Sequence, residues 1–116
     1  MFLYYIALNA AAIFANIALL KYGAKQNVEV IIKDETRRMF ALRDGKVTIK
    51  GQPEGYISVF AFDEKCQGVS IKGLKYEVKD ICLSNSVPLG VSNEFVGKDA
   101  VIEVTKGTLL ITYDKK

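Results

Sequence analysis

Residues 28–62, with the sequence VEVIIKDETRRMFALRDGKVTIKGQPEGYISVFAF, decide the fold class of this chain. Short runs rich in Val, Ile, Tyr and Phe alternate there with Gly, Asp and Pro, which is the pattern of consecutive β-strands. The runs 28–33, 37–42 and 46–50 are separated by turn formers and predict a meander of antiparallel hairpins. The run 56–62 is apolar at nearly every position, which predicts a central strand covered on both faces.

The same pattern continues towards the C-terminus. Residues 69–71, 75–81, 100–104 and 108–113 alternate apolar and polar side chains, as half-buried strands do. We therefore expect a mainly β fold, a small antiparallel β-sandwich or open barrel of seven or eight strands. The stretch 83–98 is rich in turn formers and predicts an irregular loop or a bulged strand, the kind of segment in which recognition residues often lie.

A short string recurs along the chain. VTIKG at 47–51 and VSIKG at 69–73 are followed by a looser copy, EVTKG, at 103–107. Each copy is interpreted as an amphipathic strand that ends in a lysine and a turn glycine.

The N-terminal segment differs from the rest because no charged residue precedes Lys21. Residues 2–20, FLYYIALNAAAIFANIALL, contain neither Gly nor Pro, and as a helix they reach roughly the thickness of a hydrocarbon core. We expect one long apolar α-helix over residues 1–22 that spans a membrane or packs in a helical bundle. A joint at 23–27 then leads to a β-domain over 28–116.

Small and polar residues on this helix suggest helix–helix packing. Ala7, Ala11 and Ala15 fall four apart on one face, where small side chains let helices approach closely. Asn9 and Asn16 share a face and are candidates for hydrogen bonds between helices. The alternative is that alanine is simply common in apolar helices.

Composition excludes several function classes. The 16 basic and 13 acidic residues are interspersed, giving a net charge of +3 without a basic block, so nucleic acid is not an expected partner. Histidine and tryptophan are absent, and the glycines lack phosphate-cradling spacing. We expect no catalytic residues, no cofactor, no metal site and no small-molecule substrate; the chain is predicted not to be an enzyme.

Cys66 and Cys82 are the two cysteines and form a candidate disulfide. A bridge between them closes a loop of about 15 residues and stabilises the fold by roughly 3 kcal/mol in the chain-entropy model, in an oxidising compartment. The alternative is two separate buried thiols.

Residues 28–113 resemble the NusG-domain-II family of membrane-anchored β-domains through the segments VEVIIKD, FALRDGKVTIKG, GVSNEFVGKDAVIEV and TLLITY. That family carries a closely spaced cysteine pair, whereas here only Cys82 stands near the matching place. The overall layout is also similar to that of archaeal type IV pilin-like filament subunits. Tyr5 stands where bacterial pilins usually place a glutamate, so that branch is not supported.

These features lead to two alternative functions. The first is a structural, non-enzymatic subunit whose apolar helix packs with copies of itself into an extracellular pilus-like filament that displays the β-domain. The second is a single-pass membrane-anchored β-domain that binds a protein partner at the membrane. Both place the chain in a membrane, at least before assembly, with the β-domain extracytoplasmic.

Overall fold

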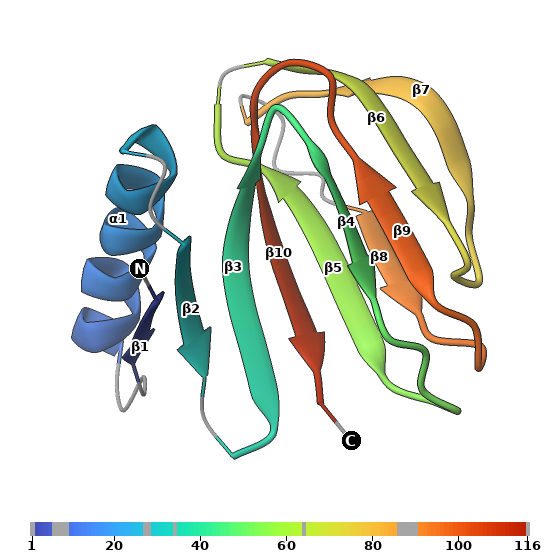
Figure 1. Cartoon of the computed structure of the whole chain (residues 1–116), viewed down its shortest axis with the longest axis horizontal. Helices are drawn as coiled ribbons and strands as arrows, with labels where there is room; N and C mark the ends of the chain where they lie inside the picture. Colours follow the sequence, from blue (N-terminus) through green and yellow to red (C-terminus); the bar gives the residue numbers. More distant parts are fainter. Residues whose placement is uncertain are drawn as a thin grey trace.

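The computed structural model describes residues 2–5, 10–26, 29–33, 35–63, 65–85 and 91–115. Over these residues the chain forms one α-helix and ten β-strands (Figure 1). In chain order the elements are β1 (Phe2–Tyr5), α1 (Ala10–Lys25), β2 (Glu29–Lys33), β3 (Arg37–Arg43), β4 (Lys46–Ile49), β5 (Tyr56–Ala61), β6 (Cys66–Lys72), β7 (Val78–Leu83), β8 (Val91–Glu94), β9 (Ala100–Glu103) and β10 (Thr108–Asp114).

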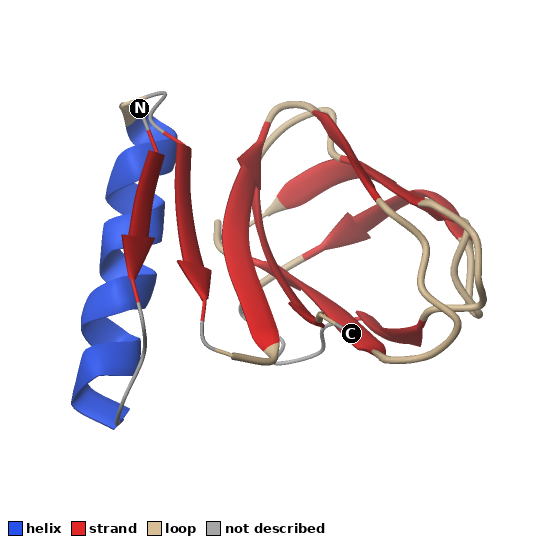
Figure 2. Ribbon diagram, turned by 60° about the horizontal axis from the view of Figure 1, so that its bottom comes forward, coloured by secondary structure: helices blue, strands red, loops and turns tan. Residues whose placement is uncertain are grey.

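The strands form two sheets that pack face to face (Figure 2). The larger sheet has the order β1-β2-β3-β10-β5-β8, and the smaller has the order β4-β9-β6-β7. Apart from the parallel pair β1–β2, the neighbouring strands run antiparallel. The expectation of a mainly β fold is confirmed, whereas the expected number of seven or eight strands is too low, since the described residues form ten.

The core between the sheets follows from side-chain alternation along the strands. In β10, Leu109 and Ile111 are fully buried between the sheets, and in β5 the same is true of Ile57 and Val59. Side chains of this size each contribute about 1.5–3 kcal/mol when they leave water. The smaller sheet faces them with a second set of buried residues: Ile49, Cys66, Val69, Ile71, Ala100 and Ile102.

A second hydrophobic cluster lies on the outer side of the larger sheet, where α1 packs. Leu20 of α1 is buried together with Val30 and Ile32 of β2, and Met39 and Leu110 lie against them. Figure 2 shows α1 alongside β1 and β2, on the side away from the smaller sheet. The helix therefore covers only one end of this sheet.

The expected long helix over residues 1–22 is wrong. Phe2–Tyr5 is a strand that pairs with β2, and the helix runs from Ala10 to Lys25. The run Phe-Leu-Tyr-Tyr favours a strand because bulky aromatic residues fit a pleated surface. In the described part of the chain, no helix combines the length and the apolar character needed to cross a bilayer. The division of the chain at residues 22 and 27 stays a prediction.

The expected meander of antiparallel hairpins over residues 28–50 is right for its first pair of strands and wrong for its third strand. β2 and β3 do form an antiparallel pair, but β4 leaves this sheet and pairs with β9. The turn between β3 and β4 forms hydrogen bonds with the turn between β9 and β10. Asp44 N donates to Gly107 O, and Gly107 N donates to the Asp44 carboxylate at 2.7 Å. This contact directs β4 into the smaller sheet.

Two of the three recurring strings end against the turn that precedes β9. β4 and β6 lie on either side of β9. A Cβ at Gly51 would meet the backbone of Lys98 and Asp99, and one at Gly73 would meet the backbone of Asp99 and Ala100. Gly51 N also donates to the Asp99 carboxylate at 2.8 Å. A side chain does not fit at either position.

Gly73 and Gly97 offer a matched test of this packing. Both have positive φ, 82° and 83°, so an alanine at either site carries similar backbone strain. A Cβ at Gly73 meets the Asp99 carbonyl, whereas nothing lies within 4 Å of one at Gly97. We expect Gly73→Ala to lower the free energy of unfolding by about 1–3 kcal/mol more than Gly97→Ala, because the backbone of Asp99 must shift. Urea unfolding of the two variants measures this, and equal losses contradict the packing described.

Candidate functional site

The helix residues predicted to pack with other helices fall where side chains are not described. Ala7 and Asn9 lie outside the described residues. Ala11, Ala15 and Asn16 belong to α1, but the structure does not describe their side chains. Their role in packing stays a prediction.

Cys66 and Cys82 are free thiols on the neighbouring strands β6 and β7. Cys66 is buried in the core with its Sγ 3.3 Å from Thr108 O, whereas Cys82 is exposed. Burial raises the pKa of the Cys66 thiol. The candidate disulfide requires the two side chains to turn towards each other, and it stays a prediction.

A buried polar side chain lies in β8, the edge strand of the larger sheet. Asn93 is only 2% exposed. Its Nδ2 donates to Tyr76 O at 2.6 Å, and its Oδ1 accepts from Tyr76 N at 2.8 Å and from Glu94 N at 3.1 Å. The asparagine side chain acts together with the backbone hydrogen bond from Lys75 N to Glu94 O at 3.0 Å, and both fix the β6–β7 connection beside β8.

Two exposed tyrosines flank β8 as a result. Tyr56 of β5 pairs in register with Glu94 and is 64% exposed, and Tyr76 on the other side is 55% exposed. The Glu94 carboxylate forms an ion pair with Lys75 at 3.0 Å, and the Lys75 ammonium lies 5.3 Å from the centre of the Tyr76 ring. The hydrogen bond to Glu94 raises the pKa of Lys75. We call Tyr56, Lys75, Tyr76, Ser92 and Glu94 the β8 surface.

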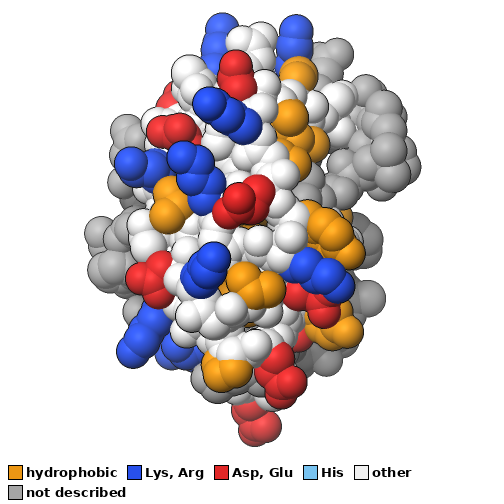
Figure 3. Space-filling model, turned by 90° about the vertical axis from the view of Figure 1, so that its right-hand side faces the viewer, with side chains coloured by type: hydrophobic (Ala, Val, Ile, Leu, Met, Phe, Trp, Pro, Cys, Tyr) orange, Lys and Arg blue, Asp and Glu red, His pale blue; other side chains and the backbone are white. Residues whose placement is uncertain are grey.

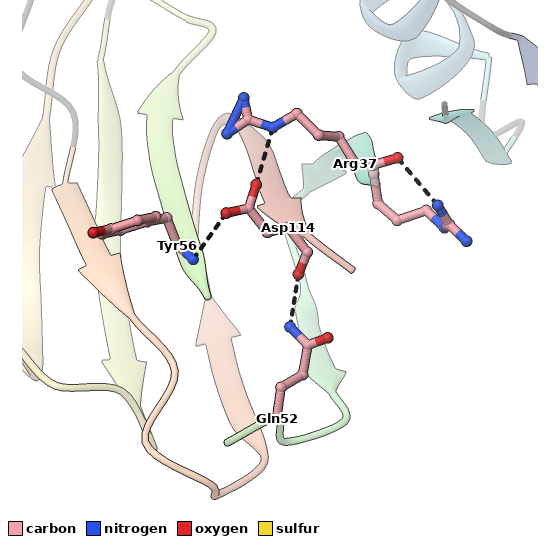
Figure 4. A network of polar contacts seen from close by, with 5 residues as sticks. Arg37, Gln52, Tyr56 and Asp114 are labelled. Carbon is pink, nitrogen blue, oxygen red and sulfur yellow. Dashed lines mark hydrogen bonds and ion pairs between the residues drawn. The ribbon is translucent and has the colours of Figure 1, made fainter. Parts of the chain in front are cut away.

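A second carboxylate is fixed next to Tyr56. Figure 4 shows Asp114 at the end of β10 between Arg37 and Tyr56. Its carboxylate accepts from Arg37 Nε at 3.1 Å and from Tyr56 N at 3.2 Å, while Gln52 Nε2 donates to its backbone oxygen at 2.7 Å. This network holds the start of β5 in place, with Tyr56 between two acidic groups.

The β8 surface is suited to a flat, positively charged ligand. Tyrosine rings attract cations through their electron-rich faces, and Glu94 and Asp114 add negative charge. On the side of the molecule that Figure 3 presents, acidic and basic side chains are interspersed with hydrophobic ones, and no single sign dominates. Among the described residues, no group of three acidic or cysteine side chains could hold a metal ion.

The sequence pattern predicts an irregular loop or a bulged strand at 83–98, of the kind that often carries recognition residues. β8, with Ser92 and Glu94, lies within this stretch, whereas Tyr56, Lys75 and Tyr76 lie outside it. The strand escaped prediction because Ser92-Asn93-Glu94 has little strand character. Pairing with β5 and the hydrogen bonds of the Asn93 side chain stabilise this strand. Neither interaction can be read from the sequence of residues 91–94 alone.

Residues 46–109 match the family model described as thiamin pyrophosphokinase, vitamin B1 binding domain. No curated protein matches the chain. Three similar solved structures are thiamin pyrophosphokinases. The one from Bacillus subtilis has a TM-score of 0.87 and 22% identity, covering 99% of this chain and 56% of that one.

The structure from Geobacillus thermodenitrificans has a TM-score of 0.87 and 19% identity, with coverage of 99% and 54%. The one from Candida albicans has a TM-score of 0.81 and 16% identity, with coverage of 100% and 45%. At these identities the likeness concerns the fold. The chain spans about half the length of these proteins.

These similarities overturn the functional predictions made from the sequence. The resemblance to NusG domain II and to pilin-like subunits is wrong, because the matched family and the similar structures named above are of thiamin pyrophosphokinases. The predicted filament subunit and the anchored partner-binding domain are wrong for the same reason.

Four narrower predictions fail with them. The matched family is a domain of an enzyme with a small-molecule substrate, so the prediction of a non-enzyme without such a substrate is wrong. Self-assembly through the N-terminal helix and a membrane or extracellular filament location are also wrong. Their basis was the long apolar helix, and α1 instead packs on β2 and β3.

Asn93 provides a test of how the β8 surface is held. Asn93→Ala leaves Tyr76 N and Tyr76 O without their side-chain partner in a part-buried position, which costs about 1–3 kcal/mol of unfolding free energy. Its exposed neighbour allows a control, since Ser92→Ala should change stability by less than about 0.5 kcal/mol. Chemical denaturation measures both, and a neutral Asn93→Ala would contradict the role assigned to the side chain.

The thiols give a second test. Because the thiolate is the reactive form and burial disfavours it at Cys66, we expect one thiol, Cys82, to react with an aromatic disulfide reagent at pH 8. Cys66 should react only when denaturant unfolds the chain. Reaction of both in the folded protein contradicts the burial of Cys66, and reaction of neither without a reductant indicates the disulfide.

Proposed function

This chain belongs to the family of thiamin pyrophosphokinase vitamin B1 binding domains, and from that premise we propose that it binds thiamin for pyrophosphorylation. The observation that carries the proposal is the family match over residues 46–109. This range contains all five residues of the β8 surface, so the whole surface falls inside the matched part of the chain.

The chemistry of thiamin supports the β8 surface as its site. Thiamin joins a positively charged thiazolium ring to an aminopyrimidine ring through a methylene group, so it presents two flat aromatic rings and one positive charge. The exposed faces of Tyr56 and Tyr76 can stack with such rings, and the cation gains from their negative faces. Glu94 can accept a hydrogen bond from the amino group or face the thiazolium charge.

The existing ion pairs do not prevent this binding. The Glu94–Lys75 and Asp114–Arg37 pairs have partly exposed side chains, and exposed pairs of this kind contribute about 0–1 kcal/mol. A cationic ligand can therefore replace or share these carboxylates at little cost. Because both carboxylates are also anchored through the backbone of their strands, they stay in position when the ligand arrives.

The role of this domain in the reaction is to hold and orient thiamin. Similar proteins are named as thiamin pyrophosphokinases, and pyrophosphorylation of thiamin by the whole protein is part of our proposal. Within the described residues, the β8 surface supplies aromatic and acidic groups, which bind the acceptor. Thiamin held in a reactive orientation reacts faster, because the entropic cost of orienting it is already met when it binds.

Tyr56 and Tyr22 provide a matched test. Both are 64% exposed, but Tyr22 lies on α1, away from the β8 surface. We expect Tyr56→Ala to weaken thiamin binding roughly five- to thirtyfold, the value of a partly desolvated cation–π contact, and Tyr22→Ala to leave it unchanged. Isothermal titration calorimetry with thiamin measures both constants.

The carboxylate has its own control. Glu94→Gln should weaken thiamin binding, whereas Glu103→Gln, on an exposed position of β9, should not. Equal affinity in Tyr56→Ala and Tyr22→Ala, or in the two glutamine variants, would remove the β8 surface as the thiamin site.

A further inference from the structure

A separate pocket of about 510 Å³ opens at the opposite end of the larger sheet. Its walls come from β2 and β3 of that sheet, from β4 at the edge of the smaller sheet, and from the residues around the end of β10. β3, β10 and β5 separate β2 from β8, so this pocket is distinct from the β8 surface. Its volume is in the range of small-molecule sites.

The floor of the pocket is apolar and aromatic. Ile31, Phe40, Ile49 and Tyr113 line it, and Phe40 and Tyr113 meet edge to face with their ring centres 6.5 Å apart. Tyr113 also contacts the buried Phe95 at 6.0 Å, which fixes its ring. Burial raises the pKa of Tyr113, so its hydroxyl is protonated at neutral pH and can donate a hydrogen bond.

The rim of the pocket is positively charged. Lys33, Arg38, Lys50 and Lys115 line it, and among the described lining residues none carries a carboxylate. Lys33 and Arg38 are direct cross-strand neighbours in β2 and β3, which places their charges together on one face. The backbone N of Lys115 donates to Thr36 O at 2.7 Å and keeps this residue near the β2–β3 turn.

We propose that this pocket binds a small organic anion that has a flat apolar body and a phosphate or carboxylate group. The apolar body lies on Phe40 and Tyr113, and the anionic group lies between Lys33 and Arg38. Hydrogen bonds from charged donors to such oxygens are short and strong. Arg38 Nη1 already donates to Arg37 O at 3.1 Å, and the guanidinium carries further N–H groups that can donate to the anion. Thiamin, a cation, is unsuited to this rim, so the proposal does not rest on the proposed function.

Calorimetric titration of the full chain with 1-naphthyl phosphate tests the proposal. We expect binding, and we expect Lys33→Met and Arg38→Met each to weaken it at least about tenfold, since each removes a charge-assisted contact. Lys72→Met, at an exposed position of β6 in the other sheet, changes the net charge equally and should have no effect. Lys50→Met, at an exposed rim position, should weaken binding even if the half-buried variants fail to fold.

Further ligands separate the parts of the proposal. Neutral 1-naphthol and inorganic phosphate should each bind at least about tenfold more weakly than 1-naphthyl phosphate, because each lacks one half of the recognised chemistry. Comparison with 1-naphthoate assigns the natural ligand to phosphates or to carboxylates, according to which binds more tightly. Failure of 1-naphthyl phosphate to bind, or equal losses in Lys72→Met and Lys50→Met, overturns the proposal.

Discussion

The pairing of β10 with both β3 and β5 is the interaction on which the rest of this structure depends. Because side chains alternate along β10, Leu109 and Ile111 enter the core between the sheets while Leu110 joins the cluster under α1. A register slip of one residue would exchange these faces and remove both clusters at once. At the end of the same strand, Asp114 holds Tyr56 in place through the start of β5.

This central strand divides the larger sheet into two ends with opposite chemistry. At the β8 end, Tyr56 and Tyr76 stand beside Glu94, which favours a cation. At the β2 end, Lys33 and Arg38 line the rim of a pocket with an aromatic floor, and this arrangement favours an anion. The two ends of the sheet have different neighbours. The β6–β7 connection borders the edge strand β8 through Asn93, whereas β2, which lies next to the edge strand β1, lines a pocket together with β4.

Strand patterns in the sequence predicted the mainly β fold, because alternation reports which face of a strand is buried. They misassigned the partner of β4, since pairing depends on the contact between the Asp44 and Gly107 turns, far apart in the chain. The uncharged N-terminal segment suggested a membrane, but an apolar helix covering a sheet looks the same locally. The sequence did not predict the residues of the β8 surface, because the contact between Asn93 and Tyr76 arises only when two distant segments meet.

The assigned function depends on thiamin binding at the β8 surface. The most direct measurement is a titration of the isotope-labelled chain with thiamin, followed through the backbone amide signals. Progressive, saturable shifts are expected at Tyr56, Tyr76 and Glu94, with no change around Lys33 and Arg38. Shifts confined to the pocket between β2 and β4, or no shifts at saturating thiamin, would contradict it.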